Sequence, residues 1–376
     1  MSVVIAGGDV ASAYGWGLDA LWTGLFSGKT PICSTSRFVD RGFVSDLMAL
    51  VPDLQTDGDE SRSIAMLRRL LSPLAGKLDP LTPLILATTV GEIEYVERSV
   101  LNDARELAES ARPLVLLEKI KHLLALRGPA LFLSSACASS SATLTRAASM
   151  IHHEQAQSVL VVTCDAVSEF VYSGFSTLLS LCDGPARPFD AARSGLTLGE
   201  GAAWALLASD QSPLTKGWKT AIAGWGNTTD AVHMTAPHRQ ASGLTRAITK
   251  ACAMANCTPQ DIAFIAAHGT ATVFSDAMEL LALRATMDRP KPIFSIKGGT
   301  GHTLAAAGLM QILVAARALS LGVVPPTVGL CAADPAAAGW VHTMPIELTT
   351  GRAALSTNSG FGGVNTAVIL SGRQPA

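Results

Sequence analysis

A cysteine surrounded by small side chains is the first residue of this sequence that could do chemistry. Cys137 lies in the run LSSACASSS, at the start of a stretch with the pattern of a helix. The N–H groups and the dipole at a helix start favour thiolate over thiol, and the same N–H groups can hold an oxyanion on an attacked thioester. Cys137 is therefore a candidate nucleophile. The alternative is a buried structural cysteine, the common fate of this residue type.

Two histidines could supply the rest of such a site. His268 follows an apolar strand pattern in AAHGTATVFSDAMEL, and His302 lies at a predicted helix start in SIKGGTGHTLAAAG. A helix start lowers the pKa of a histidine and favours the neutral imidazole. Two neutral imidazoles that donate to one carbonyl oxygen would stabilise a developing enolate. We expect the nearby Lys297 to be paired and partly buried. A core histidine with satisfied hydrogen bonds is the alternative for His268.

A glycine-rich turn near the C-terminus is the third candidate. The segment STNSGFGGVNTAVIL places Phe361 between glycines, ahead of the last strand pattern. The backbone N–H of Phe361 could face an anion while its ring acts as a gate, because glycines on both sides leave the backbone free to move. A tight hairpin without a chemical role is the alternative.

The elements that must position these residues alternate between short apolar runs and Ala/Leu-rich stretches. The apolar runs predict strands over residues 3–6, 84–87, 130–134, 159–163, 202–207, 220–224, 264–267, 293–296, 355–357 and 367–370. Apolar residues at helical spacing predict helices over residues 18–27, 63–74, 139–153, 243–255, 276–286 and 304–321. Alternation of the two kinds predicts α/β layers.

Two segments share one order of elements. ALFLSSACASSSATLTRAASMI and PIFSIKGGTGHTLAAAGLMQILVAARAL each run from a strand through a tight turn into a helix of small residues. A duplicated fold would bring their helix starts, with Cys137 and His302, to a central interface. The polar stretch 209–217 is a plausible seam. We expect an N-terminal half over residues 1–212 that carries the cysteine and a C-terminal half over residues 213–376 that carries both histidines.

Composition and charge exclude several classes of function. Hydrophobic residues make up 48% and charged residues 15% of the chain, which suits a large core and not a disordered tail. A net charge of -2 removes the electrostatic case for nucleic-acid binding. No apolar run reaches the roughly 20 residues of a membrane span, and the N-terminus shows neither a secretory signal nor a lipidation motif. We therefore expect a cytoplasmic protein without a membrane partner.

Cysteine and glycine spacing argue against cofactors. The 7 cysteines have no framework spacing, which favours a reducing compartment. The sequence has no CxxC motif and no recognised His or Cys ligand spacing, so we expect no metal site. The GTG run at 299–301 lacks the third glycine of a dinucleotide fingerprint, and GLFSGKT is too short between its glycines for a phosphate loop.

Together these segments resemble the β-ketoacyl-acyl-carrier-protein synthases, the decarboxylating condensing enzymes of the thiolase superfamily. The resemblance covers nearly the whole chain and runs through LWTGLFSGKTPI, LRGPALFLSSAC, RPFDAARSGLTLGEGAA, DAVHMTAPH, HGTATVFSDAMEL, SIKGGTGH and NSGFGGVN. It implies an α/β fold, the thiolase-like five-layered αβαβα sandwich built from two pseudo-duplicated halves, and a dimer of two identical or two related subunits.

The resemblance also implies a role for each matching residue. Cys137 would take an acyl chain from the phosphopantetheine of an acyl carrier protein, and His268 and His302 would hold the malonyl thioester carbonyl during decarboxylation. The N–H groups of Cys137 and Phe361 would form the oxyanion hole. Lys297 would be a catalytic residue that organises the histidine side of the pocket. The remaining implied roles are structural support by Glu279 and Asp276, pantetheine contacts from Thr270 and Thr272, and a gate of Phe175 and Phe361. No metal or redox cofactor is implied.

Departures from the family pattern concern the substrate pocket and its partners. Ser359 stands where an aromatic ring is usual, and Val273 and Ser275 stand where Pro and Gly are usual. The segment 39–127, which in the family supplies part of the acyl pocket, the dimer interface and the carrier-protein surface, is shorter here. Its candidates for contact with an acidic carrier protein are Arg62, Arg68 and Arg69. Acyl chain length, saturation and pathway are not readable from these residues.

The leading functional prediction is decarboxylative Claisen condensation that extends a fatty acid or polyketide chain by two carbons. The alternative is a chain-length-factor-like partner subunit of a ketosynthase heterodimer, with little or no activity of its own. Such subunits typically lack the nucleophilic cysteine, which is present here. A thiolase would need a second cysteine as base, and a Cys–His hydrolase would be hindered by an apolar pocket. His302, where initiating synthases place Asn, argues for elongation.

Overall fold

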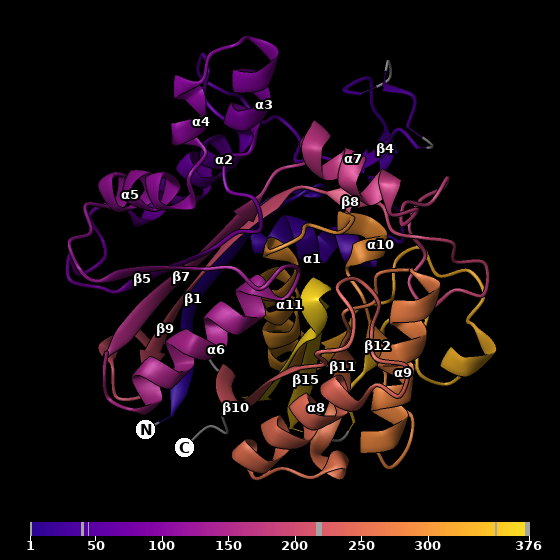
Figure 1. Ribbon diagram of the computed structural model, residues 1–376. Coiled ribbons are helices and arrows are strands. Elements are labelled where there is room, and N and C mark those ends of the chain that lie inside the picture. The colour runs from indigo at the N-terminus through magenta and orange to yellow at the C-terminus, as the bar shows by residue number, and fades with distance from the viewer. Residues whose placement is uncertain (1, 39–40, 44, 216–219, 350–351, 373–376) are drawn as a thin grey trace.

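The structure, a computed structural model, describes residues 2–38, 41–43, 45–215, 220–349 and 352–372. Two sheets alternate with three layers of helices, which run from the upper left to the lower right in Figure 1. The five-layered α/β architecture predicted from the sequence is confirmed.

The first sheet belongs to the N-terminal half. Its order is β1, β9, β7, β5, β6, antiparallel from β1 through β9 to β7 and parallel from β7 through β5 to β6. The bounds are β1 (Val3–Ser12), β5 (Leu84–Ala87), β6 (Ala130–Leu133), β7 (Ser158–Asp165) and β9 (Gly201–Ser209). β5 and β7 are almost continuously apolar and buried, as expected for strands that helices cover on both faces.

The second sheet repeats the first. Its order is β10, β16, β15, β11, β12, again antiparallel over the first two pairings and parallel over the last two. The bounds are β10 (Thr220–Thr229), β11 (Ile262–Ala266), β12 (Ile293–Phe294), β15 (Ala353–Gly360) and β16 (Val364–Gly372). Numbered along the chain within each half, both sheets read 1-5-4-2-3, so the expected duplication of the fold is confirmed.

The join between the halves is only partly described. β1 pairs with β10 over a short register, Val3 opposite Ile222 and Val4 opposite Ala221, which links the two sheets. Of the predicted seam, residues 216 and 217 lie outside the described residues. A boundary at residue 212 stays a prediction.

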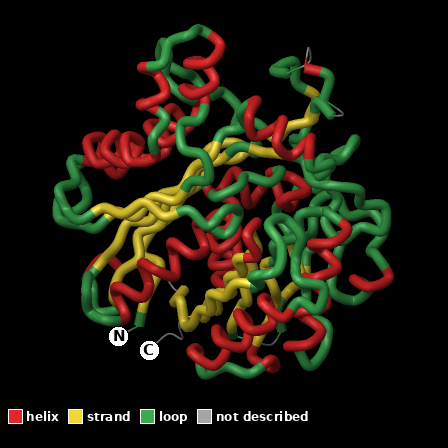
Figure 2. Tube along the Cα trace, viewed as in Figure 1, coloured by secondary structure: helices red, strands yellow, loops and turns green. Residues whose placement is uncertain are grey.

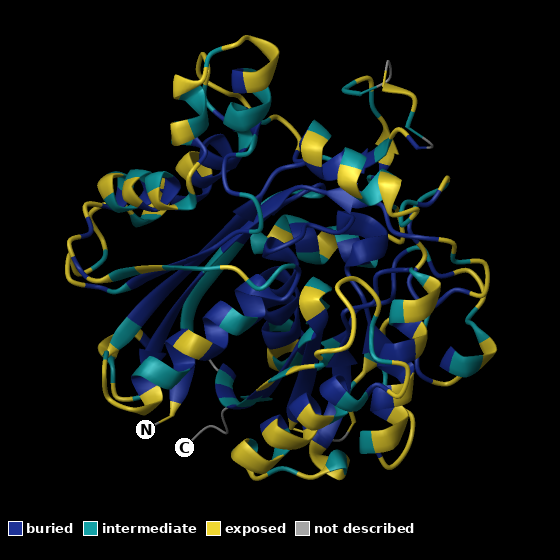
Figure 3. Ribbon diagram, in the orientation of Figure 1, coloured by how far each residue is buried: buried dark blue, intermediate teal, exposed yellow. Residues whose placement is uncertain are grey.

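Two helices form the middle layer and bring the two halves together. They are α6 (Ser139–His152) and α11 (Ala306–Leu321), and each follows the third strand of its half. Small residues let them approach closely. Leu309 N donates to Ser140 Oγ (2.9 Å), and a side chain at Gly308 would overlap Ser141. Most residues of both helices are buried, and in Figure 3 α6 is mainly dark blue with a few intermediate and exposed residues.

The outer layers are amphipathic helices. α2 (Arg62–Leu71) and α5 (Pro113–Leu124) cover the first sheet, and α8 (Ser242–Ala255) and α9 (Val273–Thr286) cover the second. Each buries one face against its sheet and leaves the other exposed, as the alternating colours of these helices in Figure 3 show. No helix within the described residues is long and apolar enough to cross a membrane.

Shorter elements connect these layers (Figure 2). The helices are α1 (Leu18–Phe26), α3 (Glu94–Leu101), α4 (Glu106–Ser110), α7 (Glu169–Thr177) and α10 (Lys297–Thr300). The short strands are β2 (Gly15–Trp16), β3 (Cys33–Ser34), β4 (Leu47–Ala49), β8 (Leu198–Gly199), β13 (Val323–Val324) and β14 (Ile346–Glu347). Sequence periodicity predicted α1 but missed α3, α4, α5, α7 and α10, mainly because most of them are too short for a clear helical period.

Candidate active site

Cys137 lies on a tight turn between β6 and α6. The preceding residue, Ala136, has a φ of 49°, in the left-handed region where a residue with a Cβ is strained. Ser139 holds the turn, since its Oγ accepts a hydrogen bond from Ser135 N (2.8 Å). The turn directs the cysteine into a pocket, where it is 6% exposed.

The protonation state of Cys137 differs from the prediction. Burial raises the pKa of the thiol to about 11, and this outweighs the lowering by Lys297 and by the backbone N–H groups of Phe361 and Cys137. The thiolate expected from the helix start is therefore wrong for the resting protein. The reason is that the site is dry, and desolvation of a charge outweighs the favourable dipole and N–H groups.

Gly360 allows the C-terminal turn to approach the cysteine. A Cβ at this position would lie 2.8 Å from Ser135 O and 3.1 Å from Cys137 N, so a larger residue would push the two segments apart. The next residues form a single 3-10 turn (Phe361–Gly363). This approach places the N–H groups of Phe361 and Cys137 beside the sulfur. Two converging N–H donors beside a nucleophile are the geometry of an oxyanion hole.

The two histidines lie on the other side of the pocket. Their ring centroids are 5.6 Å apart and their planes meet at 84°. Lys297 Nζ lies 3.5 Å from His268 Nδ1, and Leu304 N donates to His302 Nδ1 (3.3 Å). Because Nδ1 accepts in both rings, the ring proton sits on Nε2. Each ring thus carries an Nε2–H that can donate to a substrate oxygen.

Both histidines are neutral. Burial lowers the pKa of each well below its ordinary value, and the charge of Lys297 lowers both further. The predicted direction for His302 is confirmed, but its predicted cause is wrong. His302 lies in the loop between α10 and α11, and α11 begins four residues later at Ala306.

A buried carboxylate and a buried amine hold the His268 backbone. Glu279 on α9 accepts hydrogen bonds from His268 N and Gly269 N, both at 2.8 Å, and from Thr357 Oγ1 at 2.5 Å. Lys297 Nζ donates to the carbonyl oxygen of His268. Burial lowers the pKa of Lys297 to about 8, with Glu279 as the main opposing influence. Both supports lie behind the pocket and not in its lining.

We expect Glu279→Ala to destabilise the protein by about 3 kcal/mol or more, because two buried backbone N–H groups lose their acceptor at about 1–3 kcal/mol each. Urea unfolding followed by circular dichroism measures this loss. Glu347→Ala, at an exposed strand residue, is the control and should stay within about 0.5 kcal/mol of the parent protein. Equal effects of the two substitutions would contradict the supporting role of Glu279.

Asp276 organises the loop that follows His268. Its carboxylate accepts from Thr270 N (2.9 Å), Ala271 N (3.2 Å) and Phe189 N (2.8 Å). Burial nevertheless raises the pKa of Asp276 to about 7. The loop turns Thr270 and Thr272 into the pocket, with their hydroxyls 2.9 Å apart. Two hydroxyls in the pocket wall can donate hydrogen bonds to, and accept them from, a ligand that carries amide groups.

The pocket that collects these residues has a volume of about 250 Å³. Its lining includes Cys137, Phe175, His268, Thr270, Thr272, His302 and Phe361. Phe175 stacks on Phe361 at 5.7 Å and 25° and packs edge-on against His302 at 6.5 Å. The two aromatic rings thus lie together beside His302 in the wall of the pocket. The exposed side chains of Leu178 and Phe274 also line it, so its outer wall is partly apolar.

Two further polar groups belong to the site: Asp165, which was not singled out from the sequence, and Ser359, which was noted there only as a departure from the family pattern. Asp165, fully buried at the end of β7, accepts from Thr88 Oγ1 (2.6 Å) and from Ala305 N (2.8 Å), which ties the His302 loop to the N-terminal half. Ser359 Oγ donates to Asn365 Oδ1 (2.8 Å) and so makes part of the pocket wall polar. No feature of the sequence pointed to Asp165, because its partners Thr88 and Ala305 are distant along the chain.

The arginines considered for a carrier-protein surface are engaged within the chain. Arg62 forms an ion pair with Glu200, whose side chain is fully buried. Arg68 pairs with Glu60 and Asp57, and Arg69 stacks over the ring of Trp16 at 4.0 Å. Arg62 in particular neutralises a buried charge, because the carboxylate of Glu200 has no contact with water.

Comparison with known proteins agrees with this geometry. The family description "Beta-ketoacyl synthase, N-terminal domain" matches residues 115–212, and "Beta-ketoacyl synthase, C-terminal domain" matches residues 220–331. The chain belongs to the β-ketoacyl synthase family. This assigns it to the condensing acyltransferases, as the resemblance implied. The N-terminal match begins only at residue 115, so most of the segment 39–127, which is shorter here than in the family, lies outside it.

Individual β-ketoacyl synthases match over nearly their whole length. The chain is 25% identical to 3-oxoacyl-[acyl-carrier-protein] synthase 2 of Coxiella burnetii, over 98% of both chains. It is 28% identical to a protein of Streptomyces rimosus named for oxytetracycline polyketide β-ketoacyl synthase 1, over 99% of this chain and 98% of the other. Among solved structures, the ishigamide ketosynthase/chain length factor matches with a TM-score of 0.88 and 26% identity, over 99% of both chains.

Proposed function

We propose that the protein extends an acyl chain by two carbons through decarboxylative condensation with malonyl-acyl-carrier protein. The observation that carries the proposal is the convergence of one buried thiol, two neutral imidazoles and two backbone N–H donors in a single pocket. These groups come from both halves of the chain. They match the requirements of a reaction that first holds an acyl group and then stabilises an enolate.

In the first step Cys137 attacks the thioester of an acyl carrier protein. The sulfur loses its proton and bonds to the acyl carbon, and the phosphopantetheine thiol leaves with a proton. The N–H groups of Phe361 and Cys137 stabilise the oxyanion of this step. The resting group is a thiol. Lys297 and these N–H donors lower the thiol pKa that burial raises, and so they favour formation of the thiolate during the attack.

In the second step malonyl-acyl-carrier protein enters the same pocket. The Nε2–H groups of His268 and His302 donate to the malonyl thioester oxygen, so that loss of carbon dioxide leaves an enolate that they stabilise. The enolate carbon bonds to the acyl carbon on Cys137, and the thiolate departs. Neutral imidazoles suit this role because they donate without a proton that the enolate could remove easily.

The pKa shifts of the histidines lead to a prediction for pH dependence. Both pKa values lie below 6.5 in the folded protein, so both rings stay neutral as the pH falls past 6.5. We expect the acid limb of decarboxylation, measured as carbon dioxide release between pH 5 and 7.5, to lie below pH 6.5. Unfolded histidines do take up protons in this range, so the free energy of unfolding should decrease as the pH falls from 6.5. A limb centred at 6.5 or above would contradict buried neutral rings.

Reconstitution tests the whole proposal. Purified protein is incubated with an acyl-carrier thioester, then with malonyl-acyl-carrier protein, and both the mass of the protein and the released carbon dioxide are measured. A mass increase on Cys137 followed by carbon dioxide release supports the proposal. Absence of both, for the chain alone and as a homodimer, would support instead a non-catalytic partner subunit of a ketosynthase heterodimer. The ishigamide neighbour shows that such pairs exist for similar chains.

A further inference from the structure

Helix α7, which carries Phe175 of the proposed aromatic gate, is bonded at its first turn to helix α3. α7 starts at Glu169, and Glu97 on α3 accepts a hydrogen bond from Phe170 N (2.7 Å). The N–H groups of a first helical turn have no partner within the helix, and a carboxylate there is favoured by the helix dipole. The Phe170 ring is 62% exposed, so the backbone bond and not the ring ties this residue to α3.

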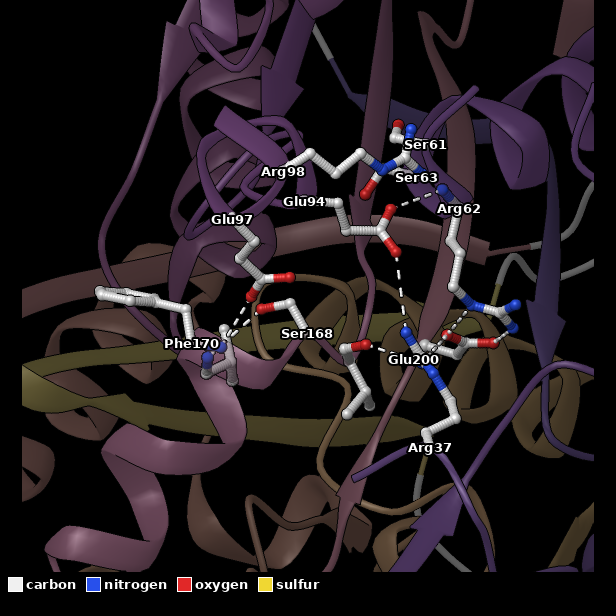
Figure 4. Close-up of polar contacts among 12 residues, drawn as sticks. Arg37, Ser61, Arg62, Ser63, Glu94, Glu97, Arg98, Ser168, Phe170 and Glu200 are labelled. Atoms are coloured by element: carbon white, nitrogen blue, oxygen red, sulfur yellow. Dashed lines mark hydrogen bonds and ion pairs between the residues drawn. The ribbon is translucent and has the colours of Figure 1, made fainter. Parts of the chain in front are cut away.

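A cluster of charged side chains fixes α3 in turn. Glu94, three residues before Glu97, accepts from Arg62 N (2.7 Å) and pairs with Arg37 (3.7 Å), as Figure 4 shows. Arg37 and Arg62 both reach the buried carboxylate of Glu200, Arg62 with a 2.8 Å hydrogen bond from Nε. Moving α3 would separate partly buried ion pairs, which is unfavourable because each partner would be left with an uncompensated charge.

The same cluster reaches the start of α7 and the His302 loop. Arg37 Nη1 donates to Val167 O (2.8 Å), directly before the helix cap Ser168. Glu200 follows β8, where Gly199 N donates to His302 O (3.1 Å). The cluster therefore links α3 to two segments beside the pocket, the start of α7 and the loop that carries His302.

The far part of α7 forms the gate. Phe175 lies in its last turn, stacked on Phe361 and edge-on to His302. Tyr172 anchors the middle of the helix, since its ring is buried beside Phe38 and Phe43. The first turn is held separately, by the bond from Phe170 N to Glu97 and by the cap at Ser168, which accepts from Val171 N. Because α7 has only 9 residues, a change at its first turn can be passed along the helix to Phe175.

We propose that Glu97 is a positioning residue for the gate: by bonding the first turn of α7 it sets the resting contact between Phe175 and Phe361 and so the size of reagent or acyl group that reaches Cys137. The statement that this contact selects acyl groups by size rests on the proposed function. The positioning itself does not, because access to a thiol can be measured without any enzymatic step.

Alkylation of Cys137 measures that access. The protein is treated with iodoacetamide, which is small, or N-phenylmaleimide, which is bulky, and modified peptides are quantified by mass spectrometry. The exposed Cys33 and Cys331 serve as internal references for reagent reactivity. We expect Glu97→Ala to raise the ratio of bulky to small modification at Cys137 at least threefold, because the gate loses its fixed seat.

Two further variants separate positioning from general damage. Glu97→Gln keeps an oxygen acceptor for Phe170 N and should stay within twofold of the parent protein. Glu109→Ala, on the neighbouring α4 with only an exposed pair to Arg112, should leave the ratio unchanged. Should Glu97→Ala fail to fold, Glu97→Asp, which keeps the charge but is too short to reach, takes its place with the same expectation. A ratio unchanged in that variant, or raised equally in Glu109→Ala, would overturn the proposal.

Carrier-protein loading then connects access to function. If the parent protein accepts acyl groups on Cys137, Glu97→Ala should raise loading of long or bulky chains relative to short ones by a similar factor. If the parent protein accepts none while the alkylation ratio still shifts, the proposed function fails and the positioning role of Glu97 stands. If loading occurs but neither ratio shifts, the positioning role fails alone.

Discussion

Cys137→Ala should abolish transfer of an acyl group from a carrier thioester to the protein, a loss of about 10³-fold or more, as is usual when a covalent nucleophile is removed. Among the residues that the structure describes, the pocket lining includes no second thiol. Intact-protein mass spectrometry after incubation with acyl-acyl-carrier protein measures the loss. The fold should persist, because the substitution removes one small, buried sulfur next to residues that are already small.

The other cysteines provide the control for this prediction. Cys331→Ala changes an exposed thiol that does not line the pocket and should load acyl groups as the parent protein does. Acyl transfer that survives in Cys137→Ala would show that the nucleophile lies elsewhere, and the two-step mechanism would have to be abandoned.

His302→Ala should separate the two steps of the reaction. Loading of Cys137 needs the thiol and the N–H groups of Phe361 and Cys137, none of which this substitution removes. Decarboxylation needs two donors at the malonyl oxygen, and loss of one such donor lowers the rate by about 10²- to 10³-fold. Carbon dioxide release from malonyl-acyl-carrier protein, measured beside the mass increase at Cys137, shows both effects in one sample.

An exposed histidine serves as the matched control. His122→Ala, in the last turn of α5, should change neither loading nor carbon dioxide release. Loss of loading together with normal decarboxylation in His302→Ala would reverse the roles assigned to the thiol and the imidazole. A large drop in thermal stability would instead indicate that the packing of Phe175 on His302 matters for the fold, and His302→Gln, which keeps an N–H donor, would then decide between the two explanations.

The residue types and their order along the chain were readable from the sequence. Apolar runs predicted each strand of the two sheets, because a strand buried on both faces must be apolar along its length. The repeated order of strand, turn and helix around Cys137 and His302 predicted that the two residues meet. The structure places Cys137 just before α6 and His302 shortly before α11, the two helices of the middle layer, and both residues line one pocket.

The charge states of the site were decided only by the tertiary structure. The helix start next to Cys137 predicted a thiolate, yet the buried pocket leaves a thiol with a pKa of about 11. His302 is neutral as predicted, but because of burial and Lys297 and not because of a helix start. In the same way Arg62, whose type suggests a surface residue, is paired with the buried Glu200. Local spacing determines the intrinsic chemistry of a side chain. Desolvation and ion pairing depend instead on which distant segments pack over that side chain, and in this site their effect on the pKa exceeds that of the helix start.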